Sequence, residues 1–171
     1  MGPETDDFLD TKEKSMKKKF TRVVLLVACT GVAILSQAQS KHCSTAKTAG
    51  AWAYTYTGTI FAQGVPLPAA AVGRYYQDAA GNLSGRQTRT VAGQSAVEEI
   101  SGNVTVNKDC SATATINVLV NGELQRTAVL AGVYDTNMNH ARHIFESLRL
   151  ADGSNVPVVL SADVARLFPE D

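Results

Sequence analysis

From residue 51 onward the chain shows short segments in which apolar and polar residues alternate, with turn residues between them. Alternation with a period of two is typical of a β-strand that buries one face. No long stretch carries a helical period. We predict eight strands, at residues 51–60, 70–78, 83–91, 96–107, 112–120, 123–135, 140–150 and 156–168.

Two of the connections carry a specific signal. Asn121-Gly122 predicts a tight hairpin, because both residues accept the positive φ angles that a type I′ turn requires. Pro66 and Pro68 predict a loop at residues 62–68, because proline cannot donate a hydrogen bond to a sheet.

The order and spacing of the strands predict an all-β fold. Strands joined by short turns form an antiparallel meander, and a meander of eight strands closes into a small barrel because closure removes exposed edges. A two-sheet β-sandwich is the alternative.

The interior of the predicted barrel is apolar. Ala112, Ala114, Ile116, Val118 and Val120 share one strand face, and so do Val156, Val158, Leu160, Ala162 and Val164. An eight-stranded barrel is either filled by its side chains or leaves room for one small ligand. A cavity of about 300 Å³ or more would support a small-molecule function, whereas a solid core would support a structural one.

The first 38 residues are excluded from the predicted barrel. Residues 16–38 have the layout of a secretory signal peptide: a basic start, an apolar run at 23–35, and Ser36-Gln37-Ala38 as the cleavage motif. Residues 1–15 are polar and are either disordered or precede a true start at Met16. The alternatives to cleavage are a signal anchor and lipid attachment at Cys29. Residues 39–50 then form an N-terminal segment, and residues 51–171 form the barrel domain.

The charge of the residues after Ala38 and the predicted export limit the classes of partner that we expect. The residues after Ala38 carry ten Lys and Arg against eleven Asp and Glu side chains, so no basic surface indicates a nucleic-acid partner. We expect a secreted or periplasmic protein with no stable membrane span after cleavage, no cofactor, and an oligomeric state that the sequence leaves open.

Two cysteines remain after the predicted cleavage, Cys43 and Cys110. An even number of cysteines in an oxidising compartment favours a disulfide. The bridge would tether the polar N-terminal segment to the barrel, and the absence of an obvious activating histidine argues against Cys110 as a nucleophile.

The titratable residues give no strong catalytic motif. His140 and His143 are three residues apart, which places them on opposite faces of a strand, so we expect no metal site and interpret both as solvated residues at a strand start. Glu98 and Glu99 are adjacent, so one of them faces inward, where it would be the acid or base of an enzyme. The main alternative places these carboxylates in cross-strand ion pairs on the outer face, with Arg86, Arg89, Arg126, Arg142 and Arg149 as partners.

Aromatic residues cluster on the first two predicted strands. Trp52, Tyr54, Tyr56 and Tyr75 are the candidate ligand-binding residues, because aromatic side chains at a barrel mouth hold an apolar ligand and offer it a polar group. Core packing is the alternative role for this set.

The segment Gly50–Tyr54 resembles the Gly-x-Trp start of lipocalins. In that family the Trp closes one end of the barrel and packs under a late basic residue, and Arg166 stands where such a residue would fall. The other lipocalin signatures are missing.

Three longer segments, at 43–54, 72–85 and 102–113, resemble a group of small exported bacterial proteins of unassigned function. This resemblance implies a secreted barrel of calycin or allene-oxide-cyclase type with a Cys43–Cys110 bridge, and it implies no activity.

These observations favour a non-enzymatic exported barrel that binds a small apolar ligand or serves as a surface or periplasmic module. The first alternative is a barrel isomerase or cyclase that uses Glu98 or Glu99. The second is a structural or adhesive domain with a filled core.

Overall fold

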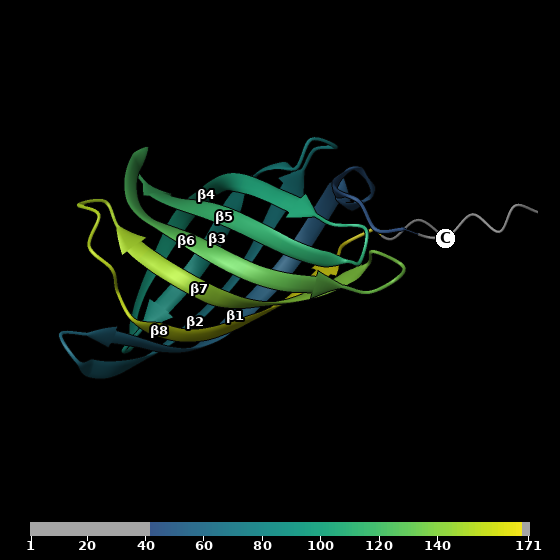
Figure 1. The fold of residues 1–171 in the computed structure, drawn as a ribbon. Helices are drawn as coiled ribbons and strands as arrows, with labels where there is room; N and C mark the ends of the chain where they lie inside the picture. Colours follow the sequence, from purple (N-terminus) through teal and green to yellow (C-terminus); the bar gives the residue numbers. More distant parts are fainter. Residues whose placement is uncertain (1–41, 169–171) are drawn as a thin grey trace, which may run out of the picture. The chain divides into compact units, whose positions relative to one another are not determined.

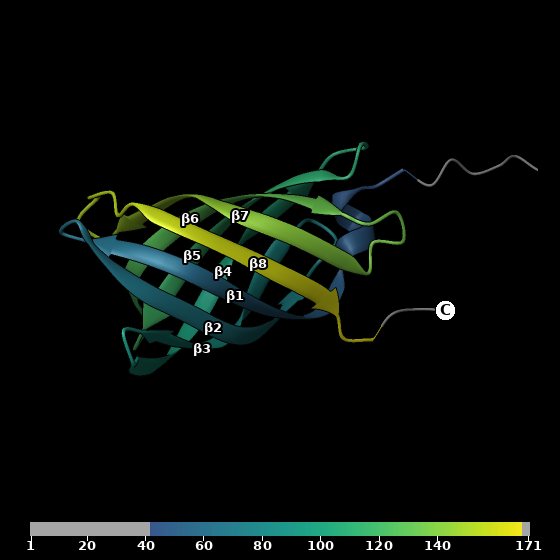
Figure 2. The same ribbon diagram turned by 90° about the horizontal axis from the view of Figure 1, so that it is seen from below.

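A computed structural model describes residues 42–168, which form eight strands and one short 3₁₀ helix (Figures 1 and 2). The helix η1 spans Thr45–Thr48. The strands are β1 Gly50–Ala62, β2 Val65–Gln77, β3 Asn82–Val91, β4 Gln94–Val106, β5 Ser111–Val120, β6 Glu123–Tyr134, β7 His140–Leu150 and β8 Val158–Arg166.

The strands form a closed barrel in which each strand pairs antiparallel with its neighbours in sequence. The last strand returns to the first, with β1–β8 pairs that run from Trp52–Arg166 to Ile60–Val158. The predicted eight-stranded meander and its closure are confirmed, and the sandwich alternative is wrong, because β1 has β8 as a second partner and no free edge remains there.

The predicted loop at residues 62–68 is wrong. The first hairpin turns at Gln63-Gly64, and β2 already begins at Val65, so that Pro66 pairs with Phe61 and Pro68 with Thr59. Pairing between β2 and β3 begins only at Ala69. Pro66 and Pro68 therefore have a neighbouring strand on one side only, where a residue without a backbone N–H is tolerated.

The two ends of the barrel differ. At one end, which we call the open end, three hairpins turn at Gln63-Gly64, Ala92-Gly93 and Asn121-Gly122, and all six residues have positive φ angles as the type I′ turn requires. The segment at residues 151–157 joins β7 to β8 at the same end. At the opposite end, which we call the closed end, η1 lies against the barrel (Figure 1).

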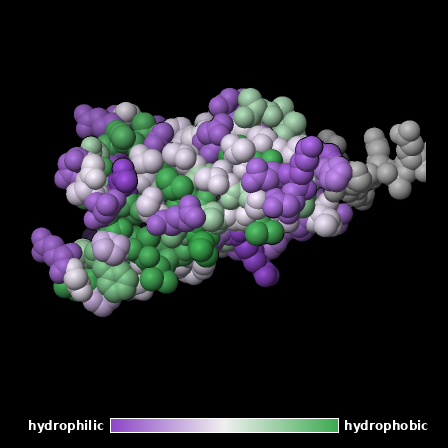
Figure 3. Space-filling model, viewed as in Figure 1, coloured by the Kyte–Doolittle hydropathy of each residue, from purple (hydrophilic) through white to green (hydrophobic). Residues whose placement is uncertain are grey.

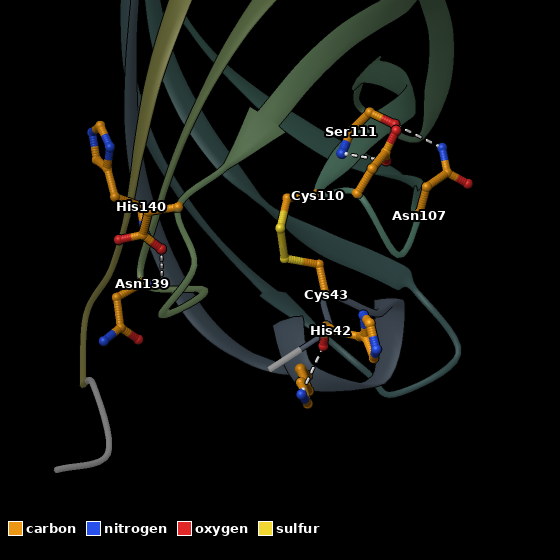
Figure 4. Close-up of a disulfide and its surroundings, with 10 residues drawn as sticks. His42, Cys43, Asn107, Cys110, Ser111, Asn139 and His140 are labelled. Atoms are coloured by element: carbon orange, nitrogen blue, oxygen red, sulfur yellow. Dashed lines mark hydrogen bonds between the residues drawn. A yellow bond between two sulfur atoms is a disulfide. The ribbon is translucent and has the colours of Figure 1, made fainter. Parts of the chain in front are cut away.

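The Cys43–Cys110 disulfide is confirmed and lies at the closed end (Figure 4). Cys110 occupies the β4–β5 turn with a φ of 69°. The backbone N–H of Val106 also donates to the Thr45 hydroxyl over 2.9 Å, so η1 is held to β4 by a hydrogen bond as well as by the covalent bridge. The N-terminal segment is thereby packed onto the barrel as its end cap.

The core fills the inside of the barrel, as the alternation predicts. Ala112, Ala114 and Val118 of β5 are buried, as are Leu160, Ala162 and Val164 of β8. Two register shifts, at Val118/Leu119 and Val129/Leu130, mark irregularities in the pairing of β6.

The predicted signal peptide and its alternatives lie outside the described residues. Within residues 42–168, no helix is long and apolar enough to cross a membrane.

Candidate functional site

A carboxylate is buried inside the barrel near the open end. Glu98 of β4 has 2% of its surface exposed. Its Oε1 accepts hydrogen bonds from Arg89 Nε at 3.0 Å and from Arg126 Nη1 at 2.9 Å. Its Oε2 accepts from Gln87 Nε2 at 2.6 Å and from Arg126 Nη2. Both oxygens of the carboxylate are thus fully engaged by donors on β3 and β6.

This network fixes the charge state of Glu98. Burial by itself would raise the pKa of the carboxyl group, but the hydrogen bonds and charge of Arg126, together with Gln87 and Arg89, outweigh burial and hold the pKa below its ordinary value. Glu98 is therefore an ionised acceptor at neutral pH. It has no proton to donate, and its lone pairs are already occupied.

The expectation of outer-face ion pairs is wrong for Glu98, Arg89 and Arg126. Glu98 faces inward, and Arg126 reaches it from β6, two strands away from β4. Glu99, the next residue, is exposed on the outer face. The alternation separates the two carboxylates as expected, but the partners of the inner one come from across the interior.

An internal cavity of about 80 Å³ lies between this network and the closed end. Its walls are apolar, with Ile100, Val104 and Leu130 among them, and Tyr54, Tyr56 and Tyr75 also line it. A cavity of this size has room for a few water molecules and is far smaller than the ~300 Å³ that a drug-sized ligand needs.

Apart from Arg126, the titratable groups on the cavity wall are neutral. Tyr54 donates its hydroxyl hydrogen to Gln87 Oε1 over 2.7 Å, which links the cavity to the Glu98 network. The Tyr134 hydroxyl is buried without a hydrogen-bond partner among residues 42–168. Burial raises the pKa of Tyr134 to about 12 and lowers that of His143 to about 4, so both side chains are uncharged at neutral pH.

Two inward-facing glycines make room for these rings. A Cβ at Gly132 would lie 2.1 Å from Cδ2 of His143, and one at Gly73 would lie 2.6 Å from the ring of Tyr54. Each of the two rings occupies the space of a side chain on a neighbouring strand. The glycines at these positions are thus explained by packing rather than by backbone conformation.

A larger pocket occupies the open end, with a volume of about 720 Å³. Its apolar lining consists of Ile60, Phe61, Ala62, Leu67, Val91, Leu148, Leu150, Val156 and Pro157. Arg89 and Arg126 also line it, so the Glu98 network forms the floor between this pocket and the internal cavity. In the space-filling view, apolar residues gather on the visible face toward the same end (Figure 3).

The predicted aromatic set divides between two locations. Tyr54, Tyr56 and Tyr75 line the internal cavity. Trp52 is fully buried at the closed end, where its Nε1 donates to the Thr48 carbonyl over 2.8 Å. The Arg166 guanidinium lies over the indole with Cζ 4.8 Å from the ring centroid. Trp52 is thus part of the end cap and not of the open-end pocket.

The predicted histidines lie on opposite faces of β7. His140 contacts Asp163 on the outer face, with Nε2 3.0 Å from the carboxylate. His143 is buried, so its interpretation as a solvated residue is wrong, because it has the same parity on β7 as the inward Ala141. Within residues 42–168, no group of three His, Cys, Asp or Glu side chains is placed to hold a metal ion.

Sequence reasoning did not select Gln87, Tyr134 or His143 as site residues. Strand parity alone would have placed them inward. Gln87 points to the same strand face as the buried Leu83, and Tyr134 points to the same face as the buried Leu130. Their meeting at one site depends on the curvature and register of the closed barrel, which the alternation does not specify.

A comparison with protein-family models finds none that matches this chain, and a comparison with curated proteins finds no significant relative.

Proposed function

We propose that this protein is an exported, calycin-like barrel that binds a small apolar ligand in the open-end pocket and performs no chemistry on it. The observation that carries the proposal is the pocket itself. Its volume of about 720 Å³ falls within the range of about 300–1,000 Å³ that is typical of small-molecule sites, and its walls are mainly apolar.

Two features support the export and the calycin-like assignment. The Cys43–Cys110 disulfide suits an oxidising compartment and agrees with the signal-like segment at residues 16–38. The contact of Arg166 with Trp52 at the capped end is the arrangement that the resemblance to lipocalins implies.

The state of Glu98 argues against the isomerase or cyclase alternative. A general acid needs a proton near neutral pH, and a general base needs a free lone pair directed at the substrate. Glu98 has a lowered pKa and both oxygens engaged by donors. Glu99 is on the outer face. Neither carboxylate is suited to acid–base catalysis inside the barrel.

The small internal cavity favours a structural or adhesive domain as the second candidate. A cavity of about 80 Å³ leaves the middle of the barrel nearly filled. The two candidates differ in what the open end does: a binding protein takes up a ligand there, whereas a structural domain does not.

Binding of the fluorescent apolar probe N-phenyl-1-naphthylamine distinguishes them. Val156→Trp enlarges a half-buried side chain of the pocket lining, and Val159→Trp places the same side chain three residues away on the outer face, where Val159 is 69% exposed. We expect the wild type and Val159→Trp to bind the probe and Val156→Trp to lose at least tenfold in affinity. Equal affinity in all three proteins, or no binding by the wild type, would reject the proposal. Native mass spectrometry of the exported protein would then identify a co-purified ligand.

A further inference from the structure

The open-end pocket carries an uncompensated positive charge. Among the described residues that line it, Arg89 and Arg126 are the charged ones. Glu98 lies behind them with 1% of its side chain exposed, and within residues 42–168 it is the single carboxylate in contact with both guanidinium groups. Two cations that share one anion leave one net positive charge at the floor of a mainly apolar pocket.

The two arginines use their donors differently. Arg126 directs both Nη groups at Glu98, whereas Arg89 donates to Glu98 through Nε alone. The two Nη groups of Arg89 make no hydrogen bond with any of residues 42–168, and 23% of its side chain is exposed. A guanidinium presents its N–H groups as a planar fork that matches a carboxylate. Arg89 therefore has the donors that such a group needs.

We propose that Arg89 binds the carboxylate of an amphiphilic ligand whose apolar part lies against the walls of the open-end pocket. This inference rests on the proposed function and adds the chemical class of the ligand, an apolar monocarboxylate. An uncharged molecule of the same shape would shield the guanidinium from water without neutralising its charge, which lowers the binding affinity. A cationic amphiphile would be repelled.

Glu98 has a positioning role in this arrangement. Its bond to Nε holds the Arg89 side chain in one geometry, so less conformational freedom is lost when a ligand binds. The bidentate contact with Arg126 keeps Glu98 itself from turning toward the pocket. The ligand carboxylate would thus meet a fixed guanidinium and not a competing anion.

The experiment is displacement of N-phenyl-1-naphthylamine by three molecules with the same chain and different ends: decanoate, decanol and decyltrimethylammonium. The variant Arg89→Gln removes the proposed partner. Arg86→Gln, three residues away on the same strand, removes the same charge from the outer face, where Arg86 is exposed. Neither substitution touches the buried bidentate pair of Arg126 and Glu98, so we expect both variants to fold, which circular dichroism checks.

We expect decanoate to bind the wild type and Arg86→Gln about tenfold to a hundredfold more tightly than decanol does, as a charge-assisted hydrogen bond predicts. In Arg89→Gln this preference should disappear, with decanol unaffected. Equal affinity for decanoate and decanol in the wild type, or the same preference in both variants, would overturn the inference and leave the apolar binding site in place. Failure of all three molecules to displace the probe would overturn the proposed function as well.

Discussion

The Arg166 guanidinium lies over the indole ring of Trp52 and joins the last strand of the barrel to its first. The same side chain donates from Nη1 to the Ala49 carbonyl over 2.7 Å and from Nη2 to the Lys47 carbonyl over 2.6 Å. These carbonyls belong to the segment that carries η1. Arg166 therefore holds three parts of the chain together: β8, β1 and the N-terminal cap.

Replacing Arg166 by Ala should weaken this end of the barrel. The cation–π contact and two hydrogen bonds to carbonyls are lost, which together should lower the free energy of unfolding by about 2–4 kcal/mol. Urea unfolding followed by the fluorescence of Trp52, the one tryptophan of the chain, measures the change directly. Arg142→Ala is the control, since 82% of the Arg142 side chain is exposed, and it should change the unfolding free energy by less than about 0.5 kcal/mol. An equal effect of the two substitutions would contradict this account of the cap.

Loss of the disulfide should also destabilise the protein. The bridge spans 67 residues of sequence, and the chain-entropy model assigns about 4 kcal/mol to a loop of that length. We expect the Cys43→Ala/Cys110→Ala double variant of the chain from residue 39 onward to unfold at a correspondingly lower urea concentration. Thiol alkylation of the unfolded protein from residue 39 onward, with both cysteines present, should add no label before reduction and two labels after it. Two labels without reductant would show that the bridge is absent.

Glu98→Gln tests the energetics of the buried network. The substitution preserves the shape of the side chain but leaves two guanidinium groups without their counter-charge. Breaking a buried ion pair in this way costs about 3–5 kcal/mol. The matched control is Glu99→Gln, one residue away on the outer face, which should cost less than about 0.5 kcal/mol. Thermal or urea unfolding of the two variants at pH 7 would distinguish the sites, and similar stabilities would show that Glu98 is not buried among charges.

The stability of the barrel should depend on pH through His143. Burial lowers the pKa of His143 from 6.5 to about 4, so the unfolded chain takes up a proton first as the pH falls. The free energy of unfolding should therefore be unchanged by this group above about pH 6.5 and should fall between pH 6.5 and pH 4 by roughly 3 kcal/mol.

Two histidine variants isolate this contribution. His143→Leu should remove most of the decline between pH 6.5 and pH 4, whereas His140→Gln, on the outer face, should keep it. Urea unfolding at half-unit intervals of pH gives the slope for each protein. A decline of the same size in wild type and His143→Leu would place its origin in another group. Glu98 is a separate contribution, because its lowered pKa makes its stabilisation disappear only as the pH falls below about 4.5.

The strands could be predicted from the sequence because alternation is a local property of the chain. The β5 and β8 faces, the Asn121-Gly122 turn and the inward placement of one of Glu98 and Glu99 all follow from a period of two. The predicted loop at Pro66 and Pro68 was wrong because a proline disrupts a strand only where a neighbouring strand needs its backbone N–H. β3 ends before it reaches these two residues.

The candidate site could be predicted only in part, because its contacts cross the barrel. The partners Glu98 and Arg126 are 28 residues apart and lie on strands that are not adjacent, so no pairing rule joins them. Trp52 and Tyr54 share one strand face, yet one belongs to the cap and the other to the cavity. Height along the barrel axis, which alternation does not encode, separates their roles.

A ligand bound at the open end would be located by an NMR titration of ¹⁵N-labelled protein with decanoate. We expect saturable shifts of the Nε–H signals of Arg89 and Arg126 and of the backbone amides of pocket residues such as Leu67 and Val156. The amides of η1 and the indole N–H of Trp52, at the capped end, should stay unchanged. Shifts confined to the closed end or the outer face, or no saturable shift at millimolar decanoate, would contradict binding at the open end.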